Sequence, residues 1–240
     1  MDILNQVNAY GVYSLSQSCW VIKKNTHKRI FPASITKLLT ALLVLEHCQM
    51  KEKIRIRQSP QAPQFRADLR VGTHYTIQSL MQGLLIGSLN DIAITLSKVV
   101  AYRAKQPWQQ LTKQYCQKIG MNKSQFVNPN GLHNPAHYTT IHDLVLLGKK
   151  VYPNTTLMNI LKMPRCKLLT ANGKKPIVFK NLNTLLRQKG VIAGKTGFTP
   201  KAGKCFLFFF EKNNQIYVAS YAGIDQENFE KVTFALIDAT

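Results

Sequence analysis

Three short motifs in this chain of 240 residues carry side chains that could do chemistry. In chain order they are Ser34-Ile35-Thr36-Lys37, Ser88-Leu89-Asn90 and Lys195-Thr196-Gly197. In the first motif the hydroxyl and the amine are three residues apart, a spacing that places both on one face of a helix. A serine becomes a nucleophile when an adjacent base accepts its proton. The spacing therefore predicts a nucleophile at Ser34, with Lys37 as its general base.

Lys37 can act as a base only if its pKa is lowered, because an unperturbed lysine has a pKa of about 10.4 and stays charged at neutral pH. Burial and a second cation both lower a lysine pKa. The segment 34–48 is apolar nearly all the way round, which predicts a buried helix, and Lys195 offers the second ammonium. In the alternative interpretation, Ser34 only caps this helix and Lys37 is a solvated charge.

The second motif lies in a short loop that begins at Gly87, between two predicted helices. Such a loop can project polar side chains into a cleft from rigid supports. Ser88 could then relay a proton, and Asn90 could hold a substrate amide. Alternatively, Asn90 caps the helix that follows it.

The third motif ends a predicted strand. Lys195 and Thr196 offer a cation and a hydroxyl to an anionic group. Gly197 removes a side chain at a place where a substrate backbone could pair with the strand edge. In the alternative interpretation, the strand simply leads into a turn.

The elements that position these motifs follow from hydrophobic periodicity and turn residues. The predicted strands are 9–15 and 19–24, joined as a hairpin, then 51–57, 165–170, 176–180, 191–195, 204–210 and 215–223, of which the last two form a second hairpin. The predicted helices are 34–48, 77–86, 91–103, 107–119, 144–151 and 228–238. Thr140-Ile141-His142-Asp143 resembles a capping box in front of one helix, with Asp in place of the usual Glu.

Strands at both ends of the chain and helices in the middle predict an α+β fold. We expect an antiparallel β-sheet flanked by helices, with a mostly helical subdomain inserted at roughly residues 58–155. The length predicts one domain, residues 1–240, that contains this subdomain. A hydrophobic content of 45% excludes a disordered chain.

Several classes of protein are disfavoured by what the sequence lacks. No apolar run approaches the roughly 18 residues of a membrane span, so we expect no integral membrane segment. The five cysteines are an odd number without a C-x-x-C pair, which disfavours a disulfide framework or a zinc site. His133 and His137 are four apart, but they lie in a predicted loop without an H-E-x-x-H sequence. We expect no metal and no cofactor.

The chain is strongly basic, with 32 Lys and Arg against 11 Asp and Glu and a formal net charge of +21. This charge is compatible with nucleic acid, an anionic membrane surface or an anionic polymer. Cations cluster at 23–29 and 51–57, but the positive charge is spread along the chain and no nucleic-acid motif is present. We therefore expect no nucleic-acid partner.

The ordered motifs resemble the D-alanyl-D-alanine carboxypeptidase family, the low-molecular-mass penicillin-binding proteins that are penicillin-recognising serine DD-peptidases. The resemblance covers nearly the whole chain. The stretches that carry it are 31–38 (FPASITKL), 87–93 (GSLNDIA), 130–132 (NGL), 140–143 (TIHD) and 194–199 (GKTGFT). The fold that it implies is that of serine β-lactamases and DD-peptidases. By the same likeness we expect a single catalytic domain over residues 1–240, without the β-rich C-terminal domain of many relatives.

The resemblance implies acylation of Ser34 by a peptidoglycan stem peptide ending in D-Ala-D-Ala, with Lys37 as general base. β-Lactams would acylate the same serine and act as inhibitors. By the same likeness, Ser88 and Asn90 assist proton transfer and positioning, Lys195 and Thr196 bind the terminal carboxylate beside Gly197, and the N–H groups of Ser34 and Phe198 form the oxyanion hole. The family works outside the cytoplasmic membrane, so we expect a periplasmic or extracytoplasmic location, although residues 1–10 lack a signal peptide.

Rival functions remain open at this point. A DD-endopeptidase that cuts peptidoglycan cross-links uses the same apparatus, and a non-catalytic basic protein could bind the cell wall. A class A β-lactamase needs a Glu between the second and third motifs, whereas the only acidic residue from Ile92 to Phe210 is Asp143, which the capping box occupies. Efficient β-lactam hydrolysis is therefore disfavoured. Leu89, where the family commonly has Gly, is expected to narrow the cleft.

Overall fold

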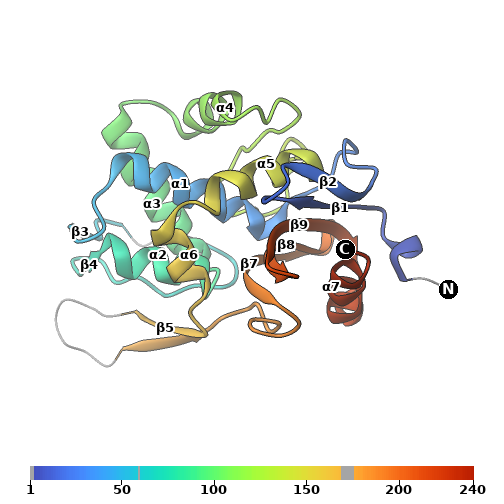
Figure 1. The fold of residues 1–240 in the computed structure, drawn as a ribbon. Coiled ribbons are helices and arrows are strands. Elements are labelled where there is room, and N and C mark those ends of the chain that lie inside the picture. The colour runs from blue at the N-terminus through green and yellow to red at the C-terminus, as the bar shows by residue number, and fades with distance from the viewer. Residues whose placement is uncertain (1–2, 59, 169–175) are drawn as a thin grey trace.

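The computed structural model describes residues 3–58, 60–168 and 176–240 (Figure 1). Its main sheet contains β1 (Ala9–Ser14), β2 (Cys19–Lys24), β7 (Val191–Thr199), β8 (Gly203–Lys212) and β9 (Gln215–Ile224). The order is β2-β1-β9-β8-β7, and every neighbouring pair is antiparallel. Two short pairs lie apart from it, β3 (Lys53–Arg55) with β4 (His74–Thr76) and β5 (Arg165–Leu168) with β6 (Ile177–Lys180).

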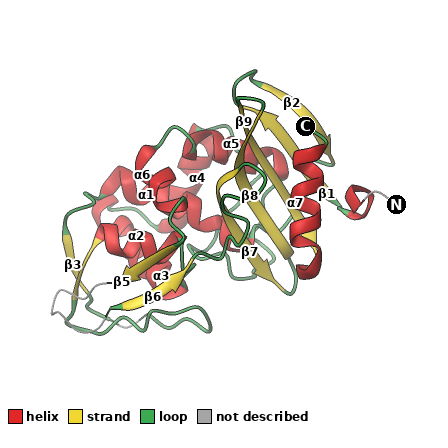
Figure 2. Cartoon of the chain, turned by 60° about the horizontal axis from the view of Figure 1, so that its bottom comes forward, coloured by secondary structure: helices red, strands yellow, loops and turns green. Residues whose placement is uncertain are grey.

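The helices divide between the two faces of the sheet. They are α1 (Thr36–His47), α2 (Ile77–Leu85), α3 (Asn90–Ala104), α4 (Trp108–Lys118), α5 (Ile141–Val151), α6 (Thr155–Leu161) and α7 (Phe229–Asp238), with 3-10 turns at Ile3–Gln6, Ala33–Ile35 and Gln226–Asn228. Helices α1–α6 gather on one side, and α7 covers the opposite face (Figures 1 and 2). Two hydrophobic clusters result, one on each face of the sheet.

Strand β8 explains why the sheet needs helices on both faces. Phe206, Phe208 and Phe210 point into the cluster beneath α7, whereas Leu207 and Phe209 point into the larger cluster on the side of α1–α6. All five are completely buried. A strand that is covered on both faces has no polar alternation, because every side chain leaves water.

Helix α1 lies in the centre of the larger cluster, and the nine residues from Thr36 to Val44 are buried. A helix that is apolar all round is stable only where other elements surround it. The predicted buried helix over 34–48 is therefore confirmed, with its first residues folded as the 3-10 turn Ala33–Ile35.

The α+β fold class is confirmed, as are both predicted hairpins. β8 and β9 are joined by Asn213 and Asn214, whose φ angles of 50° and 58° are both left-handed. A two-residue hairpin turn of type I′ requires this conformation, and Asn tolerates it better than most residues.

The structure departs from the sequence predictions in short elements and at the ends of elements. The strand predicted over 51–57 is only Lys53–Arg55, and the helix predicted over 144–151 already begins at Ile141. Helix α6 and strand β4 were not predicted, since seven and three residues are too short to establish a period. The strand predicted over 191–195 continues to Thr199, because Phe198 still pairs with Lys204 and Thr199 with Gly203 in β8. The third motif thus lies within β7 and does not end it. The predicted strand over 165–170 is described as far as Leu168, and its last two residues lie outside the described residues.

Candidate active site

Ser34 lies in the 3-10 turn that leads into α1, on a tightly bent backbone. The preceding residue, Ala33, has a φ of 46°, a left-handed conformation that a residue with a Cβ seldom adopts. Ser34 is half-buried, whereas Ala33 and Ile35 are buried. The capping interpretation is wrong, because the N-cap of α1 is Ile35 and no side chain caps this helix. Among the described residues, the hydroxyl of Ser34 therefore caps no helix.

Two glycines allow this turn to sit close to its neighbours. A Cβ on Gly131 would lie 1.8 Å from the carbonyl oxygen of Ala33, and the φ of Gly131 is 83°. A Cβ on Gly197 of β7 would lie 2.8 Å from the nitrogen of Ser34. Gly197 is thus needed because the serine turn itself packs against it, a contact that the sequence prediction of an open strand edge did not include.

Lys37 points from the first turn of α1 towards Ser34 and is completely buried. Its Nζ lies 2.8 Å from Ser34 Oγ, 2.8 Å from Asn90 Oδ1 and 2.7 Å from the carbonyl oxygen of Asn130. The alternative interpretation of Lys37 as a solvated charge is therefore wrong. Asn130 was missed as a site residue because it contributes a main-chain carbonyl, which no side-chain pattern reveals.

The surroundings of Lys37 favour the neutral amine. Burial lowers its pKa well below the ordinary lysine value, and the positive charge of Lys195 lowers it further. A neutral amine has two N–H donors and one lone pair. Asn90 Oδ1 and the carbonyl of Asn130 can accept the two N–H groups, which leaves the lone pair to accept the Ser34 hydroxyl proton. The geometry therefore suits a general base.

Asn90 joins this group to the wall of the site. Its Nδ2 donates to the carbonyl of Gln64 at 2.8 Å, and its backbone N–H donates to the carbonyl of Phe65 at 2.7 Å. The N-cap position of α3 is Leu89, and no side chain caps that helix, so the capping interpretation of Asn90 is also wrong. The next residue, Asp91, accepts the N–H of Ala67 on both carboxylate oxygens, at 3.1 and 2.9 Å.

Ser88 and Lys195 form a second polar pair. The Nζ of Lys195 donates to Ser88 Oγ and to the carbonyl of Thr196, each at 3.0 Å. Lys195 is 1% exposed, and burial, followed by the charge of Lys204, lowers its pKa to about 7. Ser88 itself has a left-handed φ of 55°, which turns the loop between α2 and α3 so that its side chain meets β7.

The remaining residues of the third motif lie farther along β7, which is one of the two edge strands of the main sheet. Thr196 is 4% exposed, and its hydroxyl forms no hydrogen bond within the described part of the chain. Phe198 is 54% exposed. The structure thus brings Ser34, Lys37, Ser88, Asn90, Lys195, Thr196, Gly197 and Phe198 to one place, where α1, the loop before α3 and β7 meet.

His137 is a further residue of this region whose contacts the sequence did not indicate. Its Nδ1 faces the N–H groups of Val127 and Asn128, which leaves the proton on Nε2 to be donated to Thr36 Oγ1 at 2.8 Å. Burial lowers the pKa of His137 to about 4. A neutral histidine therefore holds the side chain of Thr36, the residue directly before Lys37.

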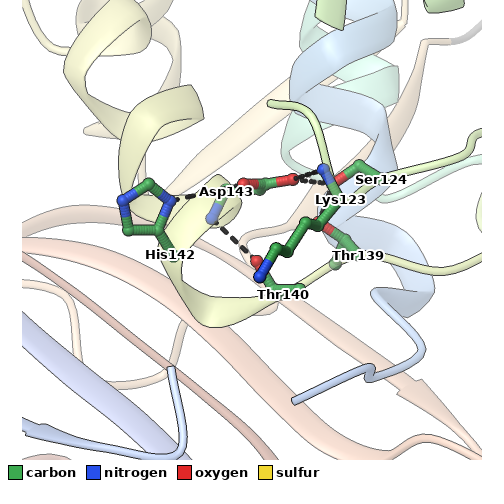
Figure 3. Close-up of polar contacts among 6 residues, drawn as sticks. All are labelled: Lys123, Ser124, Thr139, Thr140, His142 and Asp143. Carbon is green, nitrogen blue, oxygen red and sulfur yellow. Dashed lines mark hydrogen bonds and ion pairs between the residues drawn. The ribbon is translucent and has the colours of Figure 1, made fainter. Parts of the chain in front are cut away.

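The buried carboxylate of Asp143 is engaged elsewhere (Figure 3). Thr140 caps α5 by accepting the N–H of Asp143 at 3.1 Å, so one half of the predicted capping box is present. The other half is wrong: Asp143 Oδ2 accepts from the N–H of Lys123 at 2.9 Å and from Ser124 Oγ at 2.6 Å. The side chain of Asp143 thus ties the 123–124 segment to α5.

The comparisons with known proteins agree with this geometry. The family model described as D-alanyl-D-alanine carboxypeptidase matches residues 17–221. The chain belongs to this family. The carboxypeptidase DacF of Bacillus subtilis is 26% identical over 207 residues, which cover 83% of this chain and 53% of that protein. The D-alanyl-D-alanine endopeptidase of Escherichia coli is 29% identical over 221 residues, 83% of this chain and 68% of that protein.

The chain therefore spans about half the length of the Bacillus subtilis carboxypeptidase. Among solved structures, penicillin-binding protein D2 from Listeria monocytogenes in its cefotaxime-bound form has a TM-score of 0.83 and 25% identity. The likeness covers 97% of this chain and 96% of that one. In the described part of the present chain, no helix has both the length and the apolar character of a membrane span.

Proposed function

We propose that this protein is a serine-type D-Ala-D-Ala carboxypeptidase that trims peptidoglycan stem peptides through an acyl-enzyme on Ser34 and is inhibited by β-lactams. One observation carries the proposal: a completely buried lysine, Lys37, whose Nζ lies 2.8 Å from the hydroxyl of Ser34. A buried amine beside a serine has the reach and the lowered pKa that a general base requires.

In the acylation step, Ser34 Oγ attacks the carbonyl carbon between the last two D-alanines while its proton passes to Lys37 Nζ. The oxyanion of the tetrahedral intermediate accepts hydrogen bonds from the backbone N–H groups of Ser34 and Phe198. The C–N bond then breaks, and the departing amine takes a proton from Lys37, with Ser88 as relay. Loss of one such oxyanion donor typically lowers the rate by about 10²–10³-fold.

In the deacylation step, water attacks the ester carbonyl carbon while Lys37 accepts a proton of that water. The bond from the acyl carbon to Ser34 Oγ then breaks, Lys37 returns the proton to Ser34 Oγ, and the shortened peptide leaves as a carboxylic acid. Substrate recognition rests on the second and third motifs. Lys195 and the unengaged hydroxyl of Thr196 bind the terminal carboxylate, and Asn90 orients a substrate amide. The close packing of Gly197 on the serine turn keeps this carboxylate site at a fixed distance from the nucleophile.

We further propose that residues 1–240 act as a single catalytic domain, with 58–155 as its helical part, and that it works outside the cytoplasmic membrane, in the periplasm where one exists. Peptidoglycan, its substrate, lies in that compartment. Trimming of stem peptides would place the protein in cell-wall biogenesis and in the maintenance of cell shape.

Cleavage of cross-links is the second candidate activity, because the Escherichia coli relative is named an endopeptidase. Both activities use the same acyl-enzyme and differ in the amine that leaves. Release of D-alanine from a soluble pentapeptide supports the carboxypeptidase. Cleavage of a cross-linked dimer without D-alanine release supports the endopeptidase.

Intact-mass spectrometry after incubation with a penicillin tests the shared mechanism. We expect one stable adduct on the wild-type protein and none on Ser34→Ala, with both proteins melting at similar temperatures. Undiminished labelling of Ser34→Ala contradicts the assignment of the nucleophile. If the folded wild-type protein forms no adduct, the proposed enzymatic activity is contradicted, and a non-catalytic wall-binding role is favoured.

A further inference from the structure

A row of exposed cations lies along β3 and its flanking residues, apart from the candidate active site. We define the cationic row as Lys51, Lys53, Arg55 and Arg57, all of which are exposed. Of the residues between them, Ile54 packs against the hydrophobic core, Ile56 is 1% exposed, and Glu52 is half-buried and forms an ion pair with Arg103. Successive residues of a strand point to opposite faces, so Lys53 and Arg55 of β3 share one face, and Lys51 and Arg57 continue the same two-residue spacing on either side of the strand.

The backbone that carries the row is held by cross-strand hydrogen bonds. Lys53 lies opposite Thr76 in β4, and Arg55 lies opposite His74. Pairing continues beyond both ends of β3. The N–H of Ile77 donates to the carbonyl of Glu52 at 3.0 Å, and the N–H of Ile56 donates to the carbonyl of Thr73 at 2.9 Å. The row is therefore a fixed feature of the surface.

The row has no counter-charge within the described residues. None of its four side chains forms an ion pair or a hydrogen bond there. The two nearby acids are engaged with other arginines: Glu52 with Arg103 at 2.5 Å and Asp68 with Arg66 at 3.2 Å. The outward positions opposite the row, His74 and Thr76, carry no negative charge either. Four like charges therefore repel one another unless an anion lies on them.

Protection of a short strand pair against aggregation is the simplest explanation of such charges, since lysines on exposed strands prevent edge pairing. One or two charges of either sign achieve this. It does not require cations at four alternate positions, none of which is paired with an acid among the described residues. The uniform sign indicates attraction to a ligand of opposite charge.

We propose that the cationic row binds a flexible single-chain polymer carrying repeated phosphate groups. Alternate residues of a strand are about 7 Å apart, so an extended polyanion with charges at that interval or closer can meet each cation in turn. Lysine as a point charge and arginine as a planar fork are both suited to phosphate. This inference does not depend on the proposed peptidase activity.

Two other anionic partners fit the row less well. A DNA duplex is usually read by a helix or ribbon that enters a groove, and β3 and β4 have only three residues each, of which Ile54 and Tyr75 are turned inward. An anionic membrane surface is usually bound by cations together with large apolar side chains. The outward positions of β4, His74 and Thr76, are polar. In the described part of the connection between β3 and β4, two large apolar side chains are exposed, Phe65 and Val71, so the vesicle measurement below separates a membrane from a polymer.

The position of the row would keep a bound polymer near the candidate active site. The connection between β3 and β4 includes Gln64 and Phe65, whose carbonyls accept from Asn90. The same connection is held by Asp91 through the N–H of Ala67. A polymer on the row would therefore raise the local concentration of the enzyme along the material that carries the polymer.

The test compares two variants that each remove four exposed cations and lower the net charge of +21 by four. The row variant is Lys51→Gln, Lys53→Gln, Arg55→Gln and Arg57→Gln. The matched control is Lys113→Gln, Lys150→Gln, Lys162→Gln and Lys231→Gln, at exposed positions elsewhere. Binding of long-chain inorganic polyphosphate, a 20-base-pair DNA duplex and vesicles of phosphatidylglycerol with phosphatidylcholine is measured from 50 to 300 mM salt.

For polyphosphate, we expect the row variant to lose at least about tenfold in affinity at 50 mM salt, and its slope of log K against log salt to be shallower by about 3, since each contact contributes about 0.7 on a single strand. The control variant should stay within about threefold of wild type. Equal losses in both variants overturn the proposal, because net charge alone would then explain binding. Tighter binding of the duplex or the vesicles than of polyphosphate overturns the assigned partner.

Discussion

The buried lysines of the candidate site and the exposed cations of β3 contain the same kind of residue in opposite surroundings. Lys37 and Lys195 are at most 1% exposed and each has polar partners within 3.0 Å. The cationic row is exposed and has no protein partner within the described residues. Burial turns a lysine into a group that can hold or release a proton near neutral pH, whereas water keeps it a permanent positive charge.

The comparison also shows what each region requires of the backbone. The site needs glycines where segments far apart in the chain touch, at Gly131 and Gly197. In the connection between β3 and β4, Gly72 also has a left-handed φ, of 84°, but nothing lies within 4 Å of the place where its Cβ would be. Close packing at these glycines thus distinguishes the candidate site from the connection between β3 and β4.

The largest expected effect distinguishes the two kinds of cation directly. Lys37→Arg should lower the acylation rate by about 10³-fold or more, because arginine stays protonated and cannot accept the serine proton. The same substitution in the row, Lys53→Arg, should leave the rate within about twofold of wild type. Stopped-flow acylation by a chromogenic β-lactam measures both. Near-wild-type acylation by Lys37→Arg would show that another group is the base.

The second prediction compares two left-handed glycines, one from each region. Gly131→Ala should lower acylation by about 10²-fold or more, because its Cβ would be placed 1.8 Å from the carbonyl oxygen of Ala33 and would displace the serine turn. Gly72→Ala has a similar φ but open space, so only the backbone strain, of about 1 kcal/mol, should reduce its stability. Acylation rates and urea unfolding curves separate the two effects. Equal acylation rates would contradict the role given to the turn.

The third prediction concerns pH. The pKa of Lys37 is lowered, so its neutral base form is populated at pH values well below the ordinary lysine pKa. The acylation rate should therefore rise with pH in that range. The pKa of Lys195 is about 7, so the cation that binds a carboxylate is lost as pH rises through that value. We expect a bell-shaped dependence of the acylation rate on pH, whose two limbs reflect the coupled titration of Lys37 and Lys195. Lys195→Arg keeps its charge and should lose the alkaline limb, and retention of that limb would contradict the assignment.

The smallest expected effect is on the stability of the exposed region. Removing all four charges of the cationic row should leave the denaturation midpoint unchanged or slightly higher, because their mutual repulsion is relieved and no partner is lost. Thermal melts of the row variant and of its matched control, at low and high salt, measure this. A large loss of stability confined to the row variant would reveal a structural role for these cations.

The sequence by itself determined the order of the three motifs, the helical spacing of Ser34 and Lys37, and the α+β class of the fold. These features depend on local periodicity, which neighbouring residues carry. The burial of α1 could be predicted for the same reason, because apolar residues occupy nearly all sides of this helix. The predictions failed at the ends of elements: β7 continues beyond the third motif because β8 supplies partners as far as Gly203.

Only the tertiary structure decided which groups meet Lys37. The carbonyl of Asn130 lies 93 residues away in the chain and Asn90 lies 53 away, and Lys195 meets Ser88 across 107 residues. A main-chain carbonyl has no signature in the sequence. The pKa of a buried amine depends on how much water the surrounding segments remove and on which charges they bring near it, and both follow from packing between distant parts of the chain.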